Sequence, residues 1–379
     1  MRIAFVTDGI TPYVIGGMQK HSFNLLKYLA RAGVHVDLYH YNQSKLNIDA
    51  LEVFTDEEKK FIHPEVLHFP AGNKLPGHYI KSSYGYSCLA FDRYLKKPAV
   101  DLIYCKGFAG WKFVQERIKH KALPPVLVNF HGYEMFQPAP DFKTKIQQVL
   151  FLKSPVSYIL KHADGIFSYG GKITQLLREQ NVPEQKLIEI PGGIDPAWVL
   201  DLASPVETKK KFVFVGRFER RKGIQELTKA LDSMKDQPFA FTFIGPVPSD
   251  QQIKHPNIEY LGEIRDGEKI KSILSTMDVL VCPSYSEGMP NVIMEGMARG
   301  CAIIATDVGA VSLLVKSDNG QLVEIGSVAS IEKALEAFIA MEKDALQQMK
   351  AASIRRIALE FTWDKIAQQH IEQFKRFMA

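Results

Sequence analysis

Four basic side chains gather in one short stretch of the sequence, between residues 215 and 223. The stretch reads Val-Gly-Arg-Phe-Glu-Arg-Arg-Lys-Gly and separates a strand-like apolar segment from a helical pattern. Gly216 and Gly223 would let the backbone approach a ligand closely. Arg217 offers a bidentate phosphate contact and Lys222 a compact charge. The run therefore suits a diphosphate, although a merely solvated basic loop has the same composition.

A second loop, residues 283–296, adds an anion site and two carboxylates. It reads Pro-Ser-Tyr-Ser-Glu-Gly-Met-Pro-Asn-Val-Ile-Met-Glu-Gly, and a helix is predicted to begin with proline near its first position. Backbone amides at a helix N-terminus bind anions. The residues expected to form this site are Gly288, Met289, Pro290, Asn291 and Val292. Glu287 and Glu295 cannot share one helical face, so they would contact different hydroxyl groups of one ligand.

Strand-like and helical segments alternate over nearly the whole chain, which predicts parallel sheets with helices on both faces. The predicted strands of the first half are Ile3–Val6, Val34–Tyr39, Leu102–Cys105, Val126–Phe130, Gly165–Tyr169 and Leu187–Ile190. Those of the second half are Phe212–Val215, Phe239–Ile244, Ile258–Leu261, Val279–Cys282, Ala302–Ala305 and Gln321–Val323. Ligands of such sheets bind beyond the carboxyl ends of the strands, where both loops lie.

The 379 residues fit two domains better than one. The predicted domains are residues 1–195, which a C-terminal helix of about 363–379 would rejoin, and residues 196–362. A polar, charged linker is expected at 204–211. Residues 1–195 hold 24 Lys and Arg against 18 Asp and Glu, so the net charge of +5 comes from the first half. This mild surplus, without a base-reading motif, makes a nucleic-acid partner a poor fit.

In its motifs the chain resembles glycosyltransferase family 4, whose retaining enzymes have the GT-B fold of two Rossmann-like domains facing a central cleft. The motifs that carry the resemblance are Gly16-Gly17, His131-Gly132, Gly192-Gly193-Ile194-Asp195, Gly216-Arg217 with Lys222-Gly223, and the pair Glu287 and Glu295. Their order and spacing run from residue 3 to about residue 365.

The resemblance implies a role for each matching residue. The second domain would bind the nucleotide sugar, with Arg217 and Lys222 on its diphosphate and Glu295 on the ribose hydroxyls. Glu287 would contact the transferred sugar, assisted by amides of residues 288–291. In the first domain, which would bind the acceptor, Gly16 and Gly17 would approach the phosphate and His131 the donor sugar. Ile264 would lie near the nucleobase.

The expected activity is transfer of a hexose, with retention, from a nucleotide-diphosphate sugar to a glycan, lipid-linked or small-molecule acceptor. The resemblance favours a UDP-sugar donor and a role in cell-envelope polysaccharide or glycolipid synthesis. No cofactor is expected, and because the sequence contains no Asp-x-Asp motif, we expect a metal-independent enzyme. Two alternatives stay open: a sugar-nucleotide epimerase or hydrolase of similar fold, and a non-catalytic nucleotide-sugar-binding protein.

Location is the last expectation from the sequence. The longest apolar runs are strand-length, so no transmembrane helix is expected and the chain is placed in the cytoplasm. Basic and apolar residues alternate in two parts of the first half, residues 111–121 and 143–161. An amphipathic basic helix can lie on an anionic membrane, which would suit a lipid-linked acceptor. A solvated helix with one ordinary buried face fits the same pattern.

Overall fold

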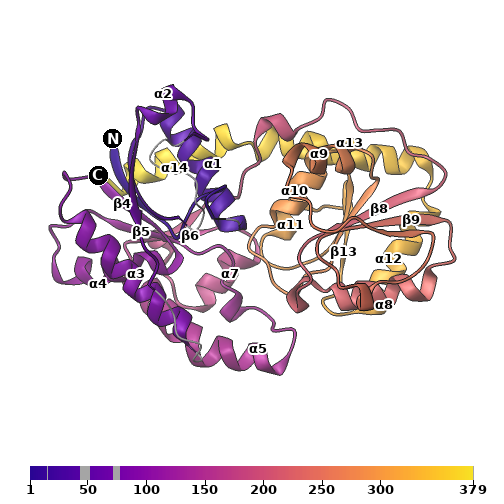
Figure 1. Ribbon diagram of the computed structural model, residues 1–379, viewed down its shortest axis with the longest axis horizontal. Helices are drawn as coiled ribbons and strands as arrows, with labels where there is room; N and C mark the ends of the chain where they lie inside the picture. Colours follow the sequence, from indigo (N-terminus) through magenta and orange to yellow (C-terminus); the bar gives the residue numbers. More distant parts are fainter. Residues whose placement is uncertain (15, 43–51, 71–76, 379) are drawn as a thin grey trace.

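The computed structural model describes residues 1–14, 16–42, 52–70 and 77–378. These residues form two parallel β-sheets, one from each half of the chain, with helices on both faces of each (Figure 1). The predicted architecture of two doubly wound α/β domains is therefore confirmed. Residue 15, in the glycine-containing loop, and residue 379, at the end of the expected last helix, lie outside the described residues.

The first sheet contains seven described strands, all parallel, in the order β3-β2-β1-β4-β5-β6-β7. They are β1 (Arg2–Val6), β2 (His35–Tyr41), β3 (Ile62–Leu67), β4 (Leu102–Lys106), β5 (Val126–Asn129), β6 (Gly165–Ser168) and β7 (Leu187–Glu189). The helices of this half are α1 (Gly17–Arg31), α2 (Asp56–Lys59), α3 (His78–Tyr94), α4 (Trp111–Lys119), α5 (Phe142–Gln147), α6 (Lys153–His162) and α7 (Lys172–Glu179). A π-helical turn, η3 (Gln148–Leu152), joins α5 to α6.

Alternation along β1 shows how both faces of this sheet are buried. Ile3 and Phe5 belong to one core with the apolar side of α1, while Ala4 and Val6 belong to another with α3 and α4. Successive side chains of a strand point to opposite faces, so a strand covered on both sides needs apolar residues throughout. Continuous apolar strands therefore direct all polar chemistry to the loops.

The second sheet has six described strands, also parallel, in the order β10-β9-β8-β11-β12-β13. They are β8 (Lys210–Val215), β9 (Phe239–Ile244), β10 (Ile258–Tyr260), β11 (Val279–Cys282), β12 (Ala302–Thr306) and β13 (Gly320–Val323). Its helices are α8 (Ile224–Met234), α9 (Gly267–Ser275), α10 (Asn291–Ala298), α11 (Val311–Leu314), α12 (Val328–Ala340) and α13 (Lys343–Glu360). Phe212 and Phe214 pack with α8 and α12, whereas Val213 packs with α10.

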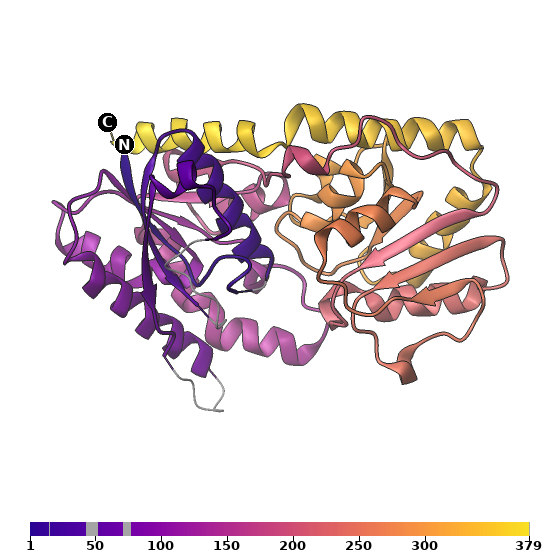
Figure 2. The ribbon, with the colours of Figure 1, turned by 45° about the horizontal axis from the view of Figure 1, so that its top comes forward.

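The last helix, α14 (Trp363–Met378), returns to the first sheet (Figure 2). Its Phe374 packs against Tyr104 of β4 and Phe167 of β6. Where the chain crosses between domains, Ile194 bonds to the segment before α14: its amide donates to Phe361 O at 2.8 Å, and its carbonyl accepts from the Trp363 amide at 3.0 Å. Two crossing segments thus lie side by side between the sheets.

One strand was missed from the sequence. β3 contains Pro64 and Glu65, and it pairs only with β2 because it lies at the edge of the sheet. Proline lacks the amide that an interior strand needs, so a proline-containing strand is tolerated at an edge and gives a weak sequence pattern.

The expected linker is also shorter than predicted, since β8 already begins at Lys210. No helix within the described ranges is long and apolar enough to cross a membrane.

Candidate active site

Loops from both sheets meet around one cavity of about 570 Å³. All but two of the predicted site residues line it. From the first domain these are Gly16, Gly17 and His131; from the second they are Gly216, Arg217, Lys222, Glu287, Gly288, Met289, Pro290, Asn291 and Val292. The two that do not are Glu295 and Ile264. The cavity lies where the carboxyl ends of the strands of the two domains face each other, as expected for sheets of this class.

A partly buried ion pair, Lys222 with Glu287, lies in the wall of this cavity. Lys222 Nζ lies 2.6 Å from Glu287 Oε1, and Ser284 Oγ donates to the same oxygen at 2.8 Å. Burial by itself would raise the pKa of the Glu287 carboxyl, but the charges of Lys222 and Arg221 outweigh it and hold that pKa below its ordinary value. Glu287 is therefore ionised at neutral pH and can accept hydrogen bonds from ligand hydroxyls.

Backbone packing fixes the position of Lys222. A 3₁₀ turn (Arg220–Lys222) follows β8 and ends at Gly223, whose φ is +68°. A Cβ on Gly223 would lie 1.9 Å from the carbonyl oxygen of Pro283, so the loops after β8 and β11 touch backbone to backbone. Only glycine allows both this positive φ and this approach. The contact holds Lys222 over Glu287.

Arg217 is placed differently, at the open side of the cavity. Its side chain is 71% exposed and pairs with Glu219 at 3.0 Å. Exposed ion pairs contribute little stability, so Arg217 can turn towards a phosphate at small cost. Together with Arg221 and Lys222, it gives the cavity three cations against the carboxylates of Glu134 and Glu287.

The N-terminus of α10 faces the same cavity. Pro290 is the residue that caps this helix, one position earlier than expected, and Asn291 begins it. The amides of the first helical turn have no acceptor within the helix, so they remain available to an anion. A Cβ on Gly17 would lie 3.6 Å from Asn291 Nδ2, which shows how closely the first glycine-containing loop approaches this helix.

Glu295 lines an adjoining cavity of about 490 Å³ that shares Gly16, Gly17 and Asn291 with the first. There it forms an ion pair with Lys20 of α1. Lys20 Nζ also lies 4.7 Å from the ring centre of Trp198. Ile264 lines neither cavity and packs against the apolar core of the second domain. The structure thus places Glu295 next to the predicted residues that line the main cavity, and it places Ile264 apart from them.

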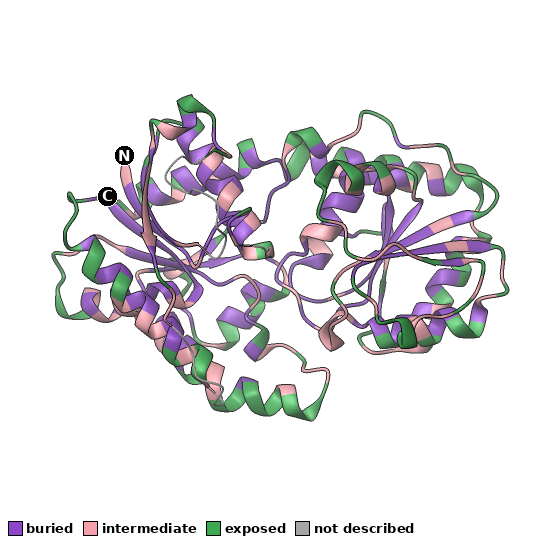
Figure 3. Cartoon of the chain, viewed as in Figure 1, coloured by how far each residue is buried: buried purple, intermediate pink, exposed green. Residues whose placement is uncertain are grey.

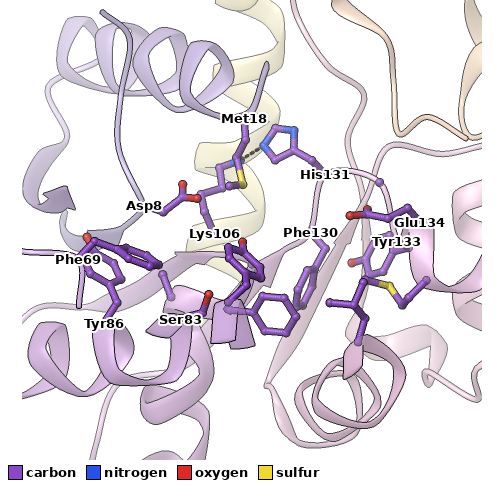
Figure 4. A pocket seen from close by; sticks show the side chains of 17 residues that line it. Asp8, Met18, Phe69, Ser83, Tyr86, Lys106, Phe130, His131, Tyr133 and Glu134 are labelled. Atoms are coloured by element: carbon purple, nitrogen blue, oxygen red, sulfur yellow. Dashed lines mark hydrogen bonds between the residues drawn. The ribbon is translucent and has the colours of Figure 1, made fainter. Parts of the chain in front are cut away.

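A third cavity, of about 300 Å³, lies in the first domain and meets the main cavity at His131, Met18, Gly132 and Glu134 (Figure 4). Lys106 is 1% exposed here, with its Nζ 2.9 Å from His21 Nδ1 and 3.4 Å from His131 Nε2. The Tyr169 hydroxyl holds His131 Nδ1 at 2.6 Å. Burial, and next the Lys106 charge, lower the pKa of His131 well below its usual value, so its imidazole is neutral at pH 7.

Sequence reasoning missed Lys106 and Asp8. Both lie at carboxyl ends of strands, since Lys106 is the last residue of β4 and Asp8 follows β1 by two residues. Burial lowers the pKa of the Lys106 ammonium and raises the pKa of Asp8 to about 6. A charged residue directly after an apolar strand was the signal that could have found them. The structure describes no group of three or more His, Cys, Asp or Glu side chains arranged to hold a metal ion.

The two domains touch across the cavity through backbone. A Cβ on Gly288 would lie 1.5 Å from the carbonyl oxygen of His131, so no side chain fits between these loops. Gln137 bridges the same loops, because its Nε2 donates to Glu287 O at 2.7 Å. Farther out, the Lys172 amide donates to Gly309 O at 2.9 Å. The described conformation is therefore closed.

Two family models match the chain. Residues 15–198 match the model described as Glycosyltransferase Family 4, and residues 209–341 match that of Glycosyl transferases group 1. An uncharacterised glycosyltransferase of Methanocaldococcus jannaschii is 24% identical over 99% of this chain and 98% of its own length. TuaC of Bacillus subtilis, named as a teichuronic acid biosynthesis glycosyltransferase, is 35% identical, but the match covers 33% of this chain and 32% of that protein. The resemblance to family 4 is confirmed.

Solved structures share the fold. Sucrose-phosphate synthase from Thermosynechococcus elongatus superposes with a TM-score of 0.77 at 20% identity, over 99% of this chain and 98% of the other. Because the likeness extends over both domains, the predicted GT-B arrangement is confirmed.

The contact between Gly288 and His131 yields a first prediction. In Gly288→Ala the added methyl would lie 1.5 Å from the His131 carbonyl oxygen, so the loops must separate. We expect a larger radius of gyration in solution scattering and glycosyl transfer reduced about 100-fold, since reacting groups misplaced by about 1 Å lose that much rate. Gly267→Ala is the control for scattering alone, because a Cβ there meets nothing within 4 Å but Gly267 lines the adjoining cavity. Scattering equal to that of this control, with wild-type activity in Gly288→Ala, would contradict the contact's role.

Asp8 yields a second prediction, on pH and stability. The unfolded carboxyl ionises near pH 3.8 and the folded one near pH 6, so the folded state binds more protons between these values. The free energy of unfolding should therefore fall as pH rises through this window, by up to about 3 kcal/mol. Asp8→Asn keeps an acceptor for the Gln19 amide, which donates to Asp8 at 3.0 Å, but cannot titrate.

Urea unfolding at pH 4, 5, 6 and 7 measures this difference. Relative to the wild type, the Asp8→Asn variant should gain stability as pH rises to 6 and change no further above pH 7. Parallel profiles for the two proteins would show that the Asp8 carboxyl keeps its ordinary pKa.

Proposed function

This chain belongs to the glycosyltransferases of the GT-B type, and we propose that it transfers a hexose, with retention, from a nucleotide-diphosphate sugar to a saccharide, lipid-linked or small-molecule acceptor. One observation carries the proposal: Lys222, Glu287 and the start of α10 share a single cavity. Cations and helix amides suit a diphosphate, and the carboxylate beside them suits a sugar. We favour a UDP-sugar on the family resemblance, and cell-envelope polysaccharide or glycolipid synthesis on the name of the Bacillus relative.

In the proposed donor complex, the diphosphate lies between Lys222, Arg217 and the first amides of α10. Lys222 is already held by Glu287 and needs little further ordering, whereas Arg217 leaves its exposed pair with Glu219 to reach the phosphate. Both charges then stabilise the negative charge that grows on the leaving diphosphate as the glycosidic bond breaks. Fixed charges in an enclosed site can supply about 3 to 4 kcal/mol for each such contact.

The nucleoside would continue along α10 into the adjoining cavity. From Asn291 to Glu295 the helix rises by about 6 Å, which suits the step from a diphosphate to the ribose hydroxyls. Glu295 lines this second cavity and can accept two hydrogen bonds once Lys20 shares it with the ligand. The second domain would therefore bind the donor, as expected for residues 196–362. We assign Ile264 no direct contact, because it lines neither cavity.

The acceptor would occupy the third cavity, in the first domain. His131 belongs to both the main and the third cavity, so the transferred sugar and the acceptor hydroxyl would meet beside it. Neutral His131 can accept or donate a hydrogen bond there without placing a second cation next to Lys106. Aromatic residues of this cavity, Phe69, Phe108 and Phe130, offer faces for a sugar ring, while Asp8 offers a hydroxyl partner.

Donor binding supplies the main test. UDP at 100 times its dissociation constant should raise the free energy of unfolding by about 2.7 kcal/mol, seen as a thermal shift. Lys222→Met should abolish most of this shift and reduce transfer at least about 100-fold, because it removes a cation that would bind the diphosphate and leaves Glu287 only the more distant Arg221, at 3.9 Å, as an ionic partner. Lys229→Met, an exposed lysine of α8, is the control. A full thermal shift in Lys222→Met would refute the proposed diphosphate site. A thermal shift with GDP but not with UDP would show that the donor nucleotide carries guanine and not uracil.

Metal independence is a separate prediction. Lys222, Arg217 and the α10 amides would carry the charge that a divalent ion carries in other transferases, so EDTA should leave the turnover rate within about twofold. Activity that EDTA removes and Mg²⁺ or Mn²⁺ restores would contradict it. Product analysis separates the alternatives in the same assay: an epimerase or hydrolase converts the donor without acceptor, and a binding protein converts nothing.

A further inference from the structure

A helical segment of the first domain has its burial pattern reversed. In residues 142–150 the large apolar side chains are exposed, while the polar Gln148 is buried and donates to Glu134 O at 2.8 Å. The exposed fractions are 76% for Phe142, 40% for Ile146, 48% for Val149 and 66% for Leu150. We call these four residues the apolar ridge. A helix that served only the core of its own domain would turn these residues inward.

The reversal begins at the π-helical turn. Beyond it, Val156, Ile159 and Leu160 of α6 pack inward, in the core of the first domain. Before it, α5 buries none of its side chains and projects from the body of the domain (Figure 3). One added residue in the turn shifts the phase of the helix, so the apolar face leaves the core. Exposed apolar patches of this kind usually mark an interaction surface.

The charge of this segment is positive. Residues 142–163 contain Lys143, Lys145, Lys153 and Lys161 and no Asp or Glu. In the part of the chain that the structure describes, none of these four ammonium groups forms an ion pair, whereas all three lysines of α2 and α4 do. Lys143 and Lys145 are exposed beside the ridge. Unpaired lysines beside exposed apolar side chains match a negatively charged surface with an apolar interior.

A groove of about 610 Å³ runs beside the ridge, between α3, α4 and the π turn. Its walls contain Ile80, Tyr84, Trp111, Phe151, Pro155 and Tyr158, with Lys81 as its charged residue and Leu150 shared with the ridge. Helix α3 separates this groove from the acceptor cavity: Ile80 and Tyr84 face the groove, while Tyr79 and Ser83 face the cavity. An apolar groove is thus one helix away from the proposed reaction site.

We propose that the apolar ridge and its lysines dock this domain on an anionic lipid bilayer, and that the acceptor is lipid-linked, with its head group entering the acceptor cavity. The acceptor part of this inference rests on the proposed function. The docking part rests on the ridge alone. Apolar side chains that insert at the head-group boundary bind through the hydrophobic effect, and the lysines are attracted to the negative charge of anionic lipids. Both contributions to the binding free energy favour the same face of the domain.

Vesicle sedimentation tests the docking part with the full chain and no sugar. Phosphatidylcholine vesicles with one third phosphatidylglycerol should bind the wild type at least about tenfold more strongly than pure phosphatidylcholine, and added salt should weaken this binding. Phe142→Ser with Leu150→Ser should reduce binding about tenfold or more, and Lys143→Gln with Lys145→Gln should do the same. All four side chains are exposed, so folding should be unaffected.

Matched variants elsewhere provide the controls. Leu202→Ser changes an apolar residue that is 78% exposed, and Lys229→Gln with Lys269→Gln removes two exposed lysines of the second domain. Both should bind vesicles as the wild type does. Equal binding to neutral and anionic vesicles, or equal loss in the controls, overturns the docking. A dimer that the ridge substitutions dissociate would assign the surface to a second copy and also overturn it.

Two readouts keep this inference apart from the proposed function. A protein that shows the UDP thermal shift but binds no vesicles overturns the docking alone. One that binds anionic vesicles without any nucleotide shift overturns the donor site, and with it the acceptor assignment. Transfer to a lipid-linked acceptor in vesicles should fall with the ridge variants, whereas the nucleotide shift should stay unchanged.

Discussion

Direct backbone contact between loops of the two domains is the constraint on which the site depends. Gly288 lies against the carbonyl of His131, and Gly223 against that of Pro283, so the first contact joins the domains and the second joins two loops within one domain. A side chain at either position would separate loops that must touch. Because the loops touch, Lys222, Glu287 and the start of α10 line one cavity, where their charges are screened less than on an open surface.

Burial of side chains in this cleft then determines which of them are charged. Two buried ionisable sites lie on either side of His131 and are stabilised in opposite ways. Glu287 stays charged because Lys222 and Arg221 compensate its burial, and the pair is ready to meet an anionic ligand. Lys106 lies between two imidazoles, where burial favours its neutral form, and His131 is neutral beside it. The cavity wall beside Lys222 therefore keeps its charges, which suits the proposed diphosphate, whereas burial opposes positive charge on Lys106 and His131 beside the proposed acceptor cavity.

The same arrangement gives the first domain an outward surface. Its core helices bury their apolar faces, but the segment on the N-terminal side of α6, formed by α5 and the start of the π turn, exposes its apolar side chains next to an apolar groove. Donor cavity, acceptor cavity and groove follow one another across the domain. Under the proposed docking, the ridge and the groove would face the bilayer while the acceptor cavity lies on the other side of α3.

The sequence by itself determined most of the strands and most of the residues that line the main cavity, because each depends on local pattern. Buried parallel strands are continuously apolar, and Gly-Arg-x5-Gly and Glu-Gly-x-Pro-Asn stand directly after two of them. Strand β3 was not predicted, because it contains a proline and a charged residue that are tolerated at the edge of a sheet but weaken the apolar pattern of a strand.

Tertiary structure alone decided which residues meet. It paired Lys222 with Glu287 and Lys20 with Glu295, and it brought Lys106 from β4 to His131 after β5. Ile264 packs against the core of the second domain instead of lining either cavity. Residues 143–161 fit an amphipathic basic helix or a solvated helix from sequence, and only the packed domain shows which apolar side chains are exposed. Contacts between distant segments depend on the order of the strands in each sheet and on which face each helix turns to the sheet. A short sequence pattern contains neither kind of information.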